Sequence, residues 1–248
     1  MKKKKVCMSM KQCICKKYLF LFTVFFLFIS FFANSQMPRK IFNPDSLTAE
    51  YFMGLKKEFG NKKQYPLQFE KQILVAFSFY PELKNIPILF RIRTRHTALN
   101  TRATWPGVFE SPRKRHFVIT ISDSSEAMLM PLMFKNVSFN AQVGVMGHEL
   151  AHVTDFLSMT TGQIIMHAVK NVSANYIDRF EYNTDAICIE HGLGYQLLEW
   201  SSLIRTKMNR EYWRGPDFAH KPMNIERYMN PGTILEKIDQ NSIYQNVK

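Results

Sequence analysis

The chain has 248 residues, of which 46% are hydrophobic. This content is enough for a core and excludes an intrinsically disordered protein. Lysine and arginine exceed aspartate and glutamate by 33 to 20, a net charge of +13. Seven of the lysines lie within the first 17 residues, so the rest of the chain carries only +6. A charge this modest gives no support to a nucleic-acid partner.

The first 35 residues have the pattern of a secretory signal. Lysines precede an apolar run over residues 18–32, and Ala33–Ser35 follows directly. A basic start, an apolar centre and small residues at the −3 and −1 positions predict export, with cleavage between Ser35 and Gln36. The alternative is an uncleaved anchor, although roughly 15 apolar residues fall short of the ~20 that span a bilayer. We expect a periplasmic or secreted protein, or membrane association through this segment if it is retained.

Residues 36–248 are predicted to form a single domain. No repeat and no Gly- or Ser-rich linker divides them, and their length suits one core. Cys188 is their only cysteine, so an intramolecular disulfide cannot stabilise them. The oligomeric state does not follow from the sequence.

The first half of this domain is predicted to contain two helices and then strands. A helix begins after residues 45–48 and ends at Phe59, and a second covers Pro66 to Tyr80. The hydrophobic period then changes to two, which predicts strands. These strands are expected over Ile88–Thr94, over His116–Ser122 and, as a shorter one, near Thr101–Trp105.

The second half is predicted to be mostly helical. With Asn140 as its N-cap, a helix carries an apolar face through Phe156, and its Gly144 and Gly147 indicate close packing. Further helices are expected over Ile177–His191 and Tyr195–Met208, with extended segments after Trp213. The fold class is therefore α+β, with a small, mainly antiparallel sheet followed by helices.

The helix that begins near Asn140 contains His148-Glu149-x-x-His152. Four residues are close to one helical turn, so both histidines lie on one face and can bind one metal ion. Glu149 lies beside them and can activate a water. The extended metzincin motif is excluded, because Asp155 and Ser158 occupy its glycine and third-histidine positions.

A catalytic zinc needs a third protein ligand, and the helix over 177–191 offers one. Glu181 and Asp185 lie four residues apart on one face of it. Glu181 is the preferred ligand, with Asp185 accepting a hydrogen bond from a ligand histidine. Asp185 as the ligand, as in aspzincins, stays open, as do Glu190 and His191.

In this combination of motifs the chain resembles the gluzincin metallopeptidases, the thermolysin-like group in which a helix bearing Glu-x-x-x-Asp follows the His-Glu-x-x-His helix. The resemblance covers residues 115–192, and no subfamily is assigned. It implies that His148, His152 and Glu181 bind Zn2+, that Glu149 is the general base and that Asp185 supports a ligand. It also implies that the motif helix packs against the Glu181 helix, and that an extended substrate pairs with an edge strand at residues 116–122.

The sequence thus predicts an exported zinc-dependent peptidase that acts on a peptide or protein substrate. The alternative is a non-catalytic exported protein with a zincin-like fold that binds a metal or a partner. The residue that stabilises the oxyanion is not assigned. Six residues are candidates for that role, each also explained by packing or surface exposure: Tyr176, Tyr182, Tyr195, Tyr212, His220 and Tyr228.

Overall fold

The structure, a computed structural model, describes residues 36–215 and 226–247. Contacts divide the chain into two compact units, and the described residues belong to the unit Gln36–Lys248. The predicted signal segment, residues 1–35, lies outside the described residues. Among the residues that are described, no helix is both long and apolar enough to cross a membrane.

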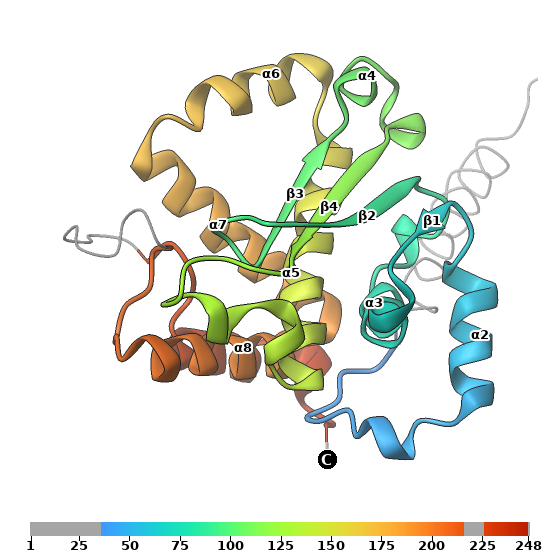
Figure 1. Ribbon diagram of the computed structural model, residues 1–248, viewed down its shortest axis with the longest axis vertical. Coiled ribbons are helices and arrows are strands. Elements are labelled where there is room, and N and C mark those ends of the chain that lie inside the picture. The colour runs from blue at the N-terminus through green and yellow to red at the C-terminus, as the bar shows by residue number, and fades with distance from the viewer. Residues whose placement is uncertain (1–35, 216–225, 248) are drawn as a thin grey trace, which may run out of the picture. The chain divides into compact units, whose positions relative to one another are not determined.

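The class α+β is confirmed, because one small sheet accompanies a larger set of helices (Figure 1). The strands are β1 Lys63–Gln64, β2 Ile88–Arg93, β3 Leu99–Ala103 and β4 Phe117–Ser122. The α-helices are α2 Ala49–Phe59, α3 Glu70–Phe77, α4 Trp105–Val108, α5 Phe139–Ser158, α6 Thr161–Lys170, α7 Ala174–Cys188, α8 Gly194–Met208 and α9 Pro231–Gln240.

The sheet is mixed, and the prediction of a mainly antiparallel sheet is wrong. Its strand order is β1-β2-β4-β3. The pairs β1–β2 and β2–β4 are parallel, and only β3–β4 is antiparallel. Alternating hydrophobicity shows which face of a strand is buried but carries no information about the direction of its neighbour.

The expected edge strand lies inside the sheet. All six residues of β4 are buried, because β2 and β3 flank it on either side. The outer strands of the described sheet are instead β1 and β3, and β3 packs directly on α5. The hydroxyl of Thr101 on β3 donates to the carbonyl oxygen of Glu149, at 3.3 Å.

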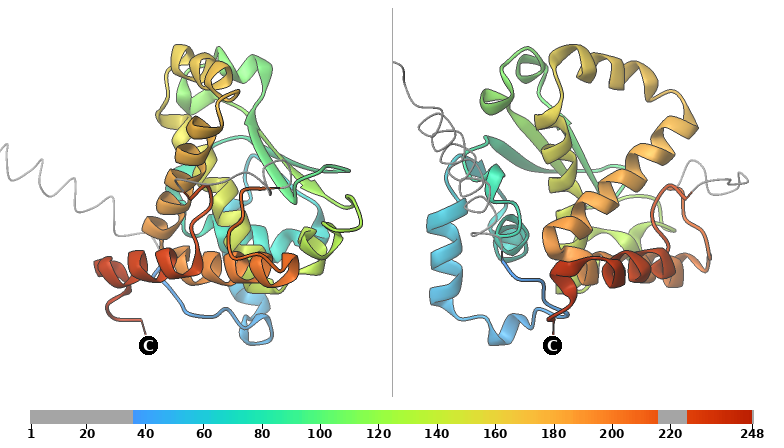
Figure 2. Two further views of the ribbon diagram at one scale, coloured as in Figure 1. Left: turned by 90° about the vertical axis from the view of Figure 1, so that its left-hand side faces the viewer. Right: turned by 180° about the vertical axis from the view of Figure 1, so that it is seen from behind.

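Helix α5 is the central element of the unit, in contact with α3, α7, α8 and β3 (Figure 2). Its N-cap is Ser138, whose hydroxyl accepts from the backbone N–H of Ala141 at 3.2 Å. The prediction of Asn140 as the cap is therefore wrong. The side chain of Asn140 instead binds both the N–H and the carbonyl of Phe42, at 2.8 and 3.1 Å.

The helices on either side of the metal motif were predicted unequally well. The helices predicted to end at Phe59 and to cover Tyr195–Met208 are confirmed by α2 and α8. Helix α7 begins three residues earlier than predicted and passes through a π-turn, Ile189–Leu193, where Gly192 has a φ of 97° that favours glycine.

Two segments differ from the prediction. Helix α6 was not predicted from the sequence, although Thr160 and Gln163 form a capping box at its start. The extended conformation predicted after Trp213 is wrong at Pro231, which begins α9; a proline is favoured in the first turn because the missing N–H has no partner there. Residues 216–225, with Pro216 and Pro222, lie outside the described residues.

Candidate metal centre

Helix α5 brings His148 and His152 together on one face, as their spacing predicts. Both side chains are buried, and their ring centroids are 4.7 Å apart at nearly a right angle. The rings are held there because α5 is buried between the sheet and helices α7 and α8, which leaves the imidazoles little freedom to turn.

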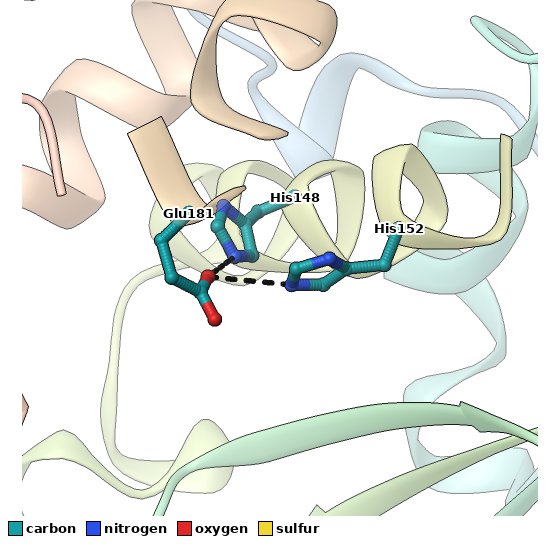
Figure 3. A group of neighbouring side chains, drawn as sticks. All are labelled: His148, His152 and Glu181. Carbon is teal, nitrogen blue, oxygen red and sulfur yellow. Dashed lines mark hydrogen bonds and ion pairs between the residues drawn. The ribbon is translucent and has the colours of Figure 1, made fainter. Parts of the chain in front are cut away.

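Helix α7 carries Glu181 to the same point. One carboxylate oxygen, Oε2, lies 3.1 Å from Nε2 of His148 and 3.4 Å from Nε2 of His152 (Figure 3). Ligand atoms that bind zinc at about 2.0–2.1 Å in a tetrahedron are about 3.3 Å apart. The spacing of these three atoms, which all lie within 4.8 Å of one another, therefore fits a single ion of this size.

Asp185, one helical turn after Glu181, lies behind His148 and not among the three ligand atoms. Its Oδ1 is 2.7 Å from Nδ1 of His148, while its Oδ2 accepts from the backbone N–H of Met229 at 2.8 Å. Both oxygens are thus already bonded. With Nδ1 protonated towards this carboxylate, the Nε2 atom of His148 keeps a lone pair for a metal.

Thr184 holds the second histidine, and the sequence analysis did not find it. Its hydroxyl donates to the carbonyl oxygen of Phe180 at 2.9 Å and lies 3.2 Å from Nδ1 of His152. Because its one proton is used by Phe180, the hydroxyl must accept the proton of Nδ1. This leaves Nε2 of His152 free as a ligand. In the sequence Thr184 stands directly before Asp185, but nothing in the local pattern marks it as a partner of His152.

Glu149 follows His148 in α5, lines the same cavity as His148 and is 95% buried. Within residues 36–215 and 226–247, its Oε2 atom is buried and has no hydrogen-bond partner. A buried carboxylate oxygen without a donor is costly, and such atoms are concentrated at functional sites. The position beside two potential metal ligands suits a carboxylate that receives a proton from a water.

The electrostatics of the cluster favour a bound cation. Burial alone would lower the pKa of His148, but hydrogen bonds to Asp185 and Glu181 outweigh it and raise this pKa well above its usual value. Burial alone would raise the pKa of Glu181, yet the charges and hydrogen bonds of His152 and His148 hold it well below its usual value. The carboxylates of Asp185 and Glu181 therefore stabilise a positive charge at this point. A proton or a metal ion can supply that charge.

A cavity of about 160 Å³ lies next to His148 and Glu149. Its volume is similar to that of an apolar cavity that binds benzene, about 150 Å³. The described residues give it a largely apolar wall made by six side chains: Leu129, Leu132, Met133, Trp200, Ile204 and Trp213. Tyr228 also lines it, with its ring 5.9 Å from that of His148.

The remaining candidates lie elsewhere or make other contacts. Glu190 is exposed, and His191 binds Glu82 at 3.0 Å, so neither joins the three ligand atoms. Tyr176 bonds to His167 at 3.0 Å. Tyr195 packs on Tyr244, Tyr212 is half exposed, Tyr182 packs at the edge of the core, and His220 lies outside the described residues.

Comparisons of the chain with protein-family models, with curated proteins and with solved structures find no match. The class of the protein therefore rests on its own fold and site. It is an α+β protein with two buried histidines and one partly buried glutamate that could hold a metal ion.

Proposed function

We propose that residues 36–248 form an exported zinc-dependent peptidase of the gluzincin type. The observation that carries the proposal is the approach of His148, His152 and Glu181 to within 4.8 Å, while Glu149 lines the same cavity as His148. Two imidazole nitrogens and one carboxylate oxygen form a donor set that zinc enzymes use. The contact between α5 and α7 supports a zincin-like packing of the two helices.

Zn2+, when bound, would polarise a scissile carbonyl and acidify a water. Glu149 would accept the proton of that water through its unpartnered oxygen and pass it to the departing amine. Asp185 and Thr184 would keep the two imidazoles in the tautomer that leaves Nε2 free. The outer side of β3 would pair with an extended peptide, since its other side is bonded to β4.

The cavity beside Glu149 favours catalysis over the alternative, a purely structural or partner-binding metal site. A structural zinc site is closed by four protein ligands, whereas the described part of the chain offers three here, next to a cavity of about 160 Å³. The apolar wall of the cavity suits a large apolar side chain of a peptide substrate.

The proposal is tested with two substitutions in the protein of residues 36–248, Glu149→Gln and Glu181→Gln. Zinc content is measured by atomic absorption. Hydrolysis is measured with labelled casein and with a peptide library. Glu149→Gln should keep zinc near one per chain and lower hydrolysis by about 10²–10⁴-fold, because the proton acceptor is lost. Glu181→Gln should lose both zinc and activity.

Glu190→Gln is the matched control, since Glu190 is exposed and lies outside the cluster. It should keep the zinc content and activity of the wild type. Full hydrolysis by zinc-loaded Glu149→Gln would contradict the assigned base. A wild-type protein that folds normally but binds no zinc would overturn the proposal as a whole.

A further inference from the structure

Two adjacent elements carry a large share of the exposed apolar side chains. Of the 14 large hydrophobic residues exposed among the described ones, six belong to α4, to α6 or to the residue or two after them. They are Trp105, Phe109, Ile165, Met166, Val169 and Val172, and we call them the tip residues. Monomeric soluble proteins rarely leave large apolar side chains gathered in this way without a partner.

The two elements lie side by side at one end of the unit of residues 36–248 (Figures 1 and 2). The hydroxyl of Thr161, at the start of α6, donates to the carbonyl oxygen of Val108 at 2.9 Å and joins them. Trp105 and Val172 are the most exposed of the tip residues, at 77% and 91%. The tip residues therefore belong to one end of the unit and not to scattered positions.

Helix α6 uses few residues to pack against the rest of the protein. Only Ile164 and His167 of this helix are buried, while Ile165, Met166 and Val169 face outward. A helix with apolar residues on both its inner and outer sides is expected to meet a second apolar phase. Among the described residues of this unit, none covers this outer side, so it is open to an occupant.

Charge indicates the kind of occupant. Between residues 156 and 177 the sequence has no acidic residue and one cation other than histidine, Lys170. Near α4 three cations are exposed: Arg102, Arg113 and Lys114. The nearby carboxylate of Glu110 is instead bonded to His116, at 2.9 Å. Apolar side chains that include tryptophan, bordered by lysine and arginine, are typical of segments that bind at the surface of anionic membranes.

We propose that the tip residues insert into the surface of an anionic phospholipid bilayer, with the cations on and near α4 and α6 bound to the headgroups. The attachment is a property of residues 36–248 and is separate from the apolar segment 18–32. It does not depend on zinc or on peptidase activity. Because α6 connects α5 to α7, membrane binding would hold the candidate metal centre close to the bilayer.

The test uses the protein of residues 36–248, a compact unit by its own contacts, so segment 18–32 cannot contribute. It is sedimented with vesicles of 30% phosphatidylglycerol in phosphatidylcholine and with vesicles of phosphatidylcholine alone. We expect binding to the anionic vesicles and at least about tenfold weaker binding to the neutral ones, because the cations lose their partners. The fluorescence of Trp105 should be quenched by brominated lipid in the anionic vesicles.

Trp105→Ser with Phe109→Ser should weaken binding to the anionic vesicles at least about tenfold, because both lost side chains are apolar anchors. The matched control is Met53→Ser with Leu67→Ser, which removes two side chains of similar exposure, 63% and 78%, outside α4 and α6. It should bind as the wild type does. The unfolding temperature of both double variants shows whether each is still folded.

The proposal is overturned if the wild type binds neither kind of vesicle, or if it binds both equally. It is also overturned if Met53→Ser with Leu67→Ser loses as much binding as the tip variant. A wild type that fails to bind vesicles but dimerises through the tip residues would assign this surface to a second copy of the chain.

Discussion

Two consecutive residues of α7 hold two different histidines of α5. Thr184 lies 3.2 Å from Nδ1 of His152, and Asp185 lies 2.7 Å from Nδ1 of His148. Neighbouring helical residues point about 100° apart, so one helix can reach two residues of its neighbour that are one turn apart. The orientation of both imidazoles thus depends on the contact between α5 and α7.

The hydroxyl of Thr184 should matter for metal binding more than its methyl group. Thr184→Val keeps the shape of the side chain but removes the acceptor for Nδ1 of His152, so this ring can turn or change its tautomer. We expect the affinity for Zn2+ to fall about 10–100-fold, measured by competition with a chelator. The loss should appear in metal affinity before it appears in the unfolding temperature of the metal-free protein.

Thr184→Ser is the control, because it restores the hydroxyl while removing the methyl group. Its affinity should stay within a few-fold of that of the wild type. If the serine and valine variants lose zinc equally, Thr184 acts through packing and not through the hydrogen bond.

At the scale of elements, the contact between α5 and α8 depends on glycine. A Cβ atom at Gly144 would overlap the backbone carbonyl oxygen of Gln196 on α8, and one at Gly147 would lie 2.5 Å from Cδ1 of Leu193, in the π-turn directly before α8. The sequence analysis predicted close packing at these two glycines, and this is confirmed. Close packing of the helices also limits how far His148 can move.

We therefore expect Gly144→Ala to destabilise the protein, although alanine is the better helix former by about 1 kcal/mol. The overlap is with backbone, which cannot turn aside, so a loss of roughly 2–4 kcal/mol is expected. Urea unfolding followed by circular dichroism measures it. Gly54→Ala in α2, where a Cβ meets nothing within 4 Å, is the control and should be neutral or stabilising.

A partly exposed ion pair between Glu82 and His191 joins the segment around Glu82 to α5 and to the π-turn. Glu82 accepts from the hydroxyl of Thr154 on α5 at 2.9 Å and bonds to His191 of the π-turn at 3.0 Å. Burial lowers the pKa of His191, but the hydrogen bond and charge of Glu82 outweigh it, so the pKa is raised. Burial raises the pKa of Glu82, but His191 outweighs it, so that pKa is lowered.

The sign of each shift predicts where in pH the pair contributes. The contribution of His191 to the free energy of unfolding is complete below its usual pKa of 6.5. It is lost as the pH rises through the raised pKa. The contribution of Glu82 is complete above its usual pKa of 4.5. It is lost as the pH falls through the lowered pKa. Both contributions are therefore complete between pH 4.5 and pH 6.5.

Glu82→Gln should therefore lower the unfolding temperature more at pH 5.5 than at pH 9. The effect should be small, about 0.2–1 kcal/mol, because the two side chains are 37% and 23% exposed and solvent screens them. Differential scanning calorimetry of wild type and variant at both pH values measures it. An equal loss at both would mean that the pair does not depend on the charge of His191.

At the scale of the whole unit, the candidate site joins segments far apart in the chain. Oδ2 of Asp185 binds the backbone of Met229, and the hydroxyl of Tyr244 donates to the carbonyl of Ile189 at 2.6 Å. The C-terminal segment thus packs against the elements that hold the metal ligands. A bound ion should stabilise this entire arrangement and not only α5.

Addition of Zn2+ should consequently raise the unfolding temperature of the whole unit. At a free concentration one hundred times the dissociation constant, binding contributes about 2.7 kcal/mol, or about 5–10 °C for a chain of this size. Calorimetry with zinc and with a chelator measures the shift. Glu181→Gln should abolish it and Glu190→Gln should leave it unchanged; a shift retained in Glu181→Gln would argue for zinc bound elsewhere.

Local patterns were enough to predict much of the helical part and half of the candidate site. The spacing of His148, Glu149 and His152 is set by the helical repeat, so their common face follows from sequence. Glu181 and Asp185 were predicted by the same periodicity on a second helix. The structure brings Glu181 to within 3.4 Å of both histidines.

Features that depend on which elements become neighbours could not be predicted in this way. The direction of β4, the position of β3 at the outside of the sheet and the cavity lined by Trp200 and Trp213 follow from non-local packing. The roles of Thr184 and Asn140 are of the same kind, since their partners lie 32 and 98 residues away.

The sequence alone therefore specified the chemistry available to this protein, because residue types and helical spacing are local properties. The tertiary structure decided which of those groups meet, because distances across a core depend on how helices and strands pack. It placed Glu181 and not Glu190 or His191 beside the two histidines, and it left apolar side chains exposed on α4 and α6.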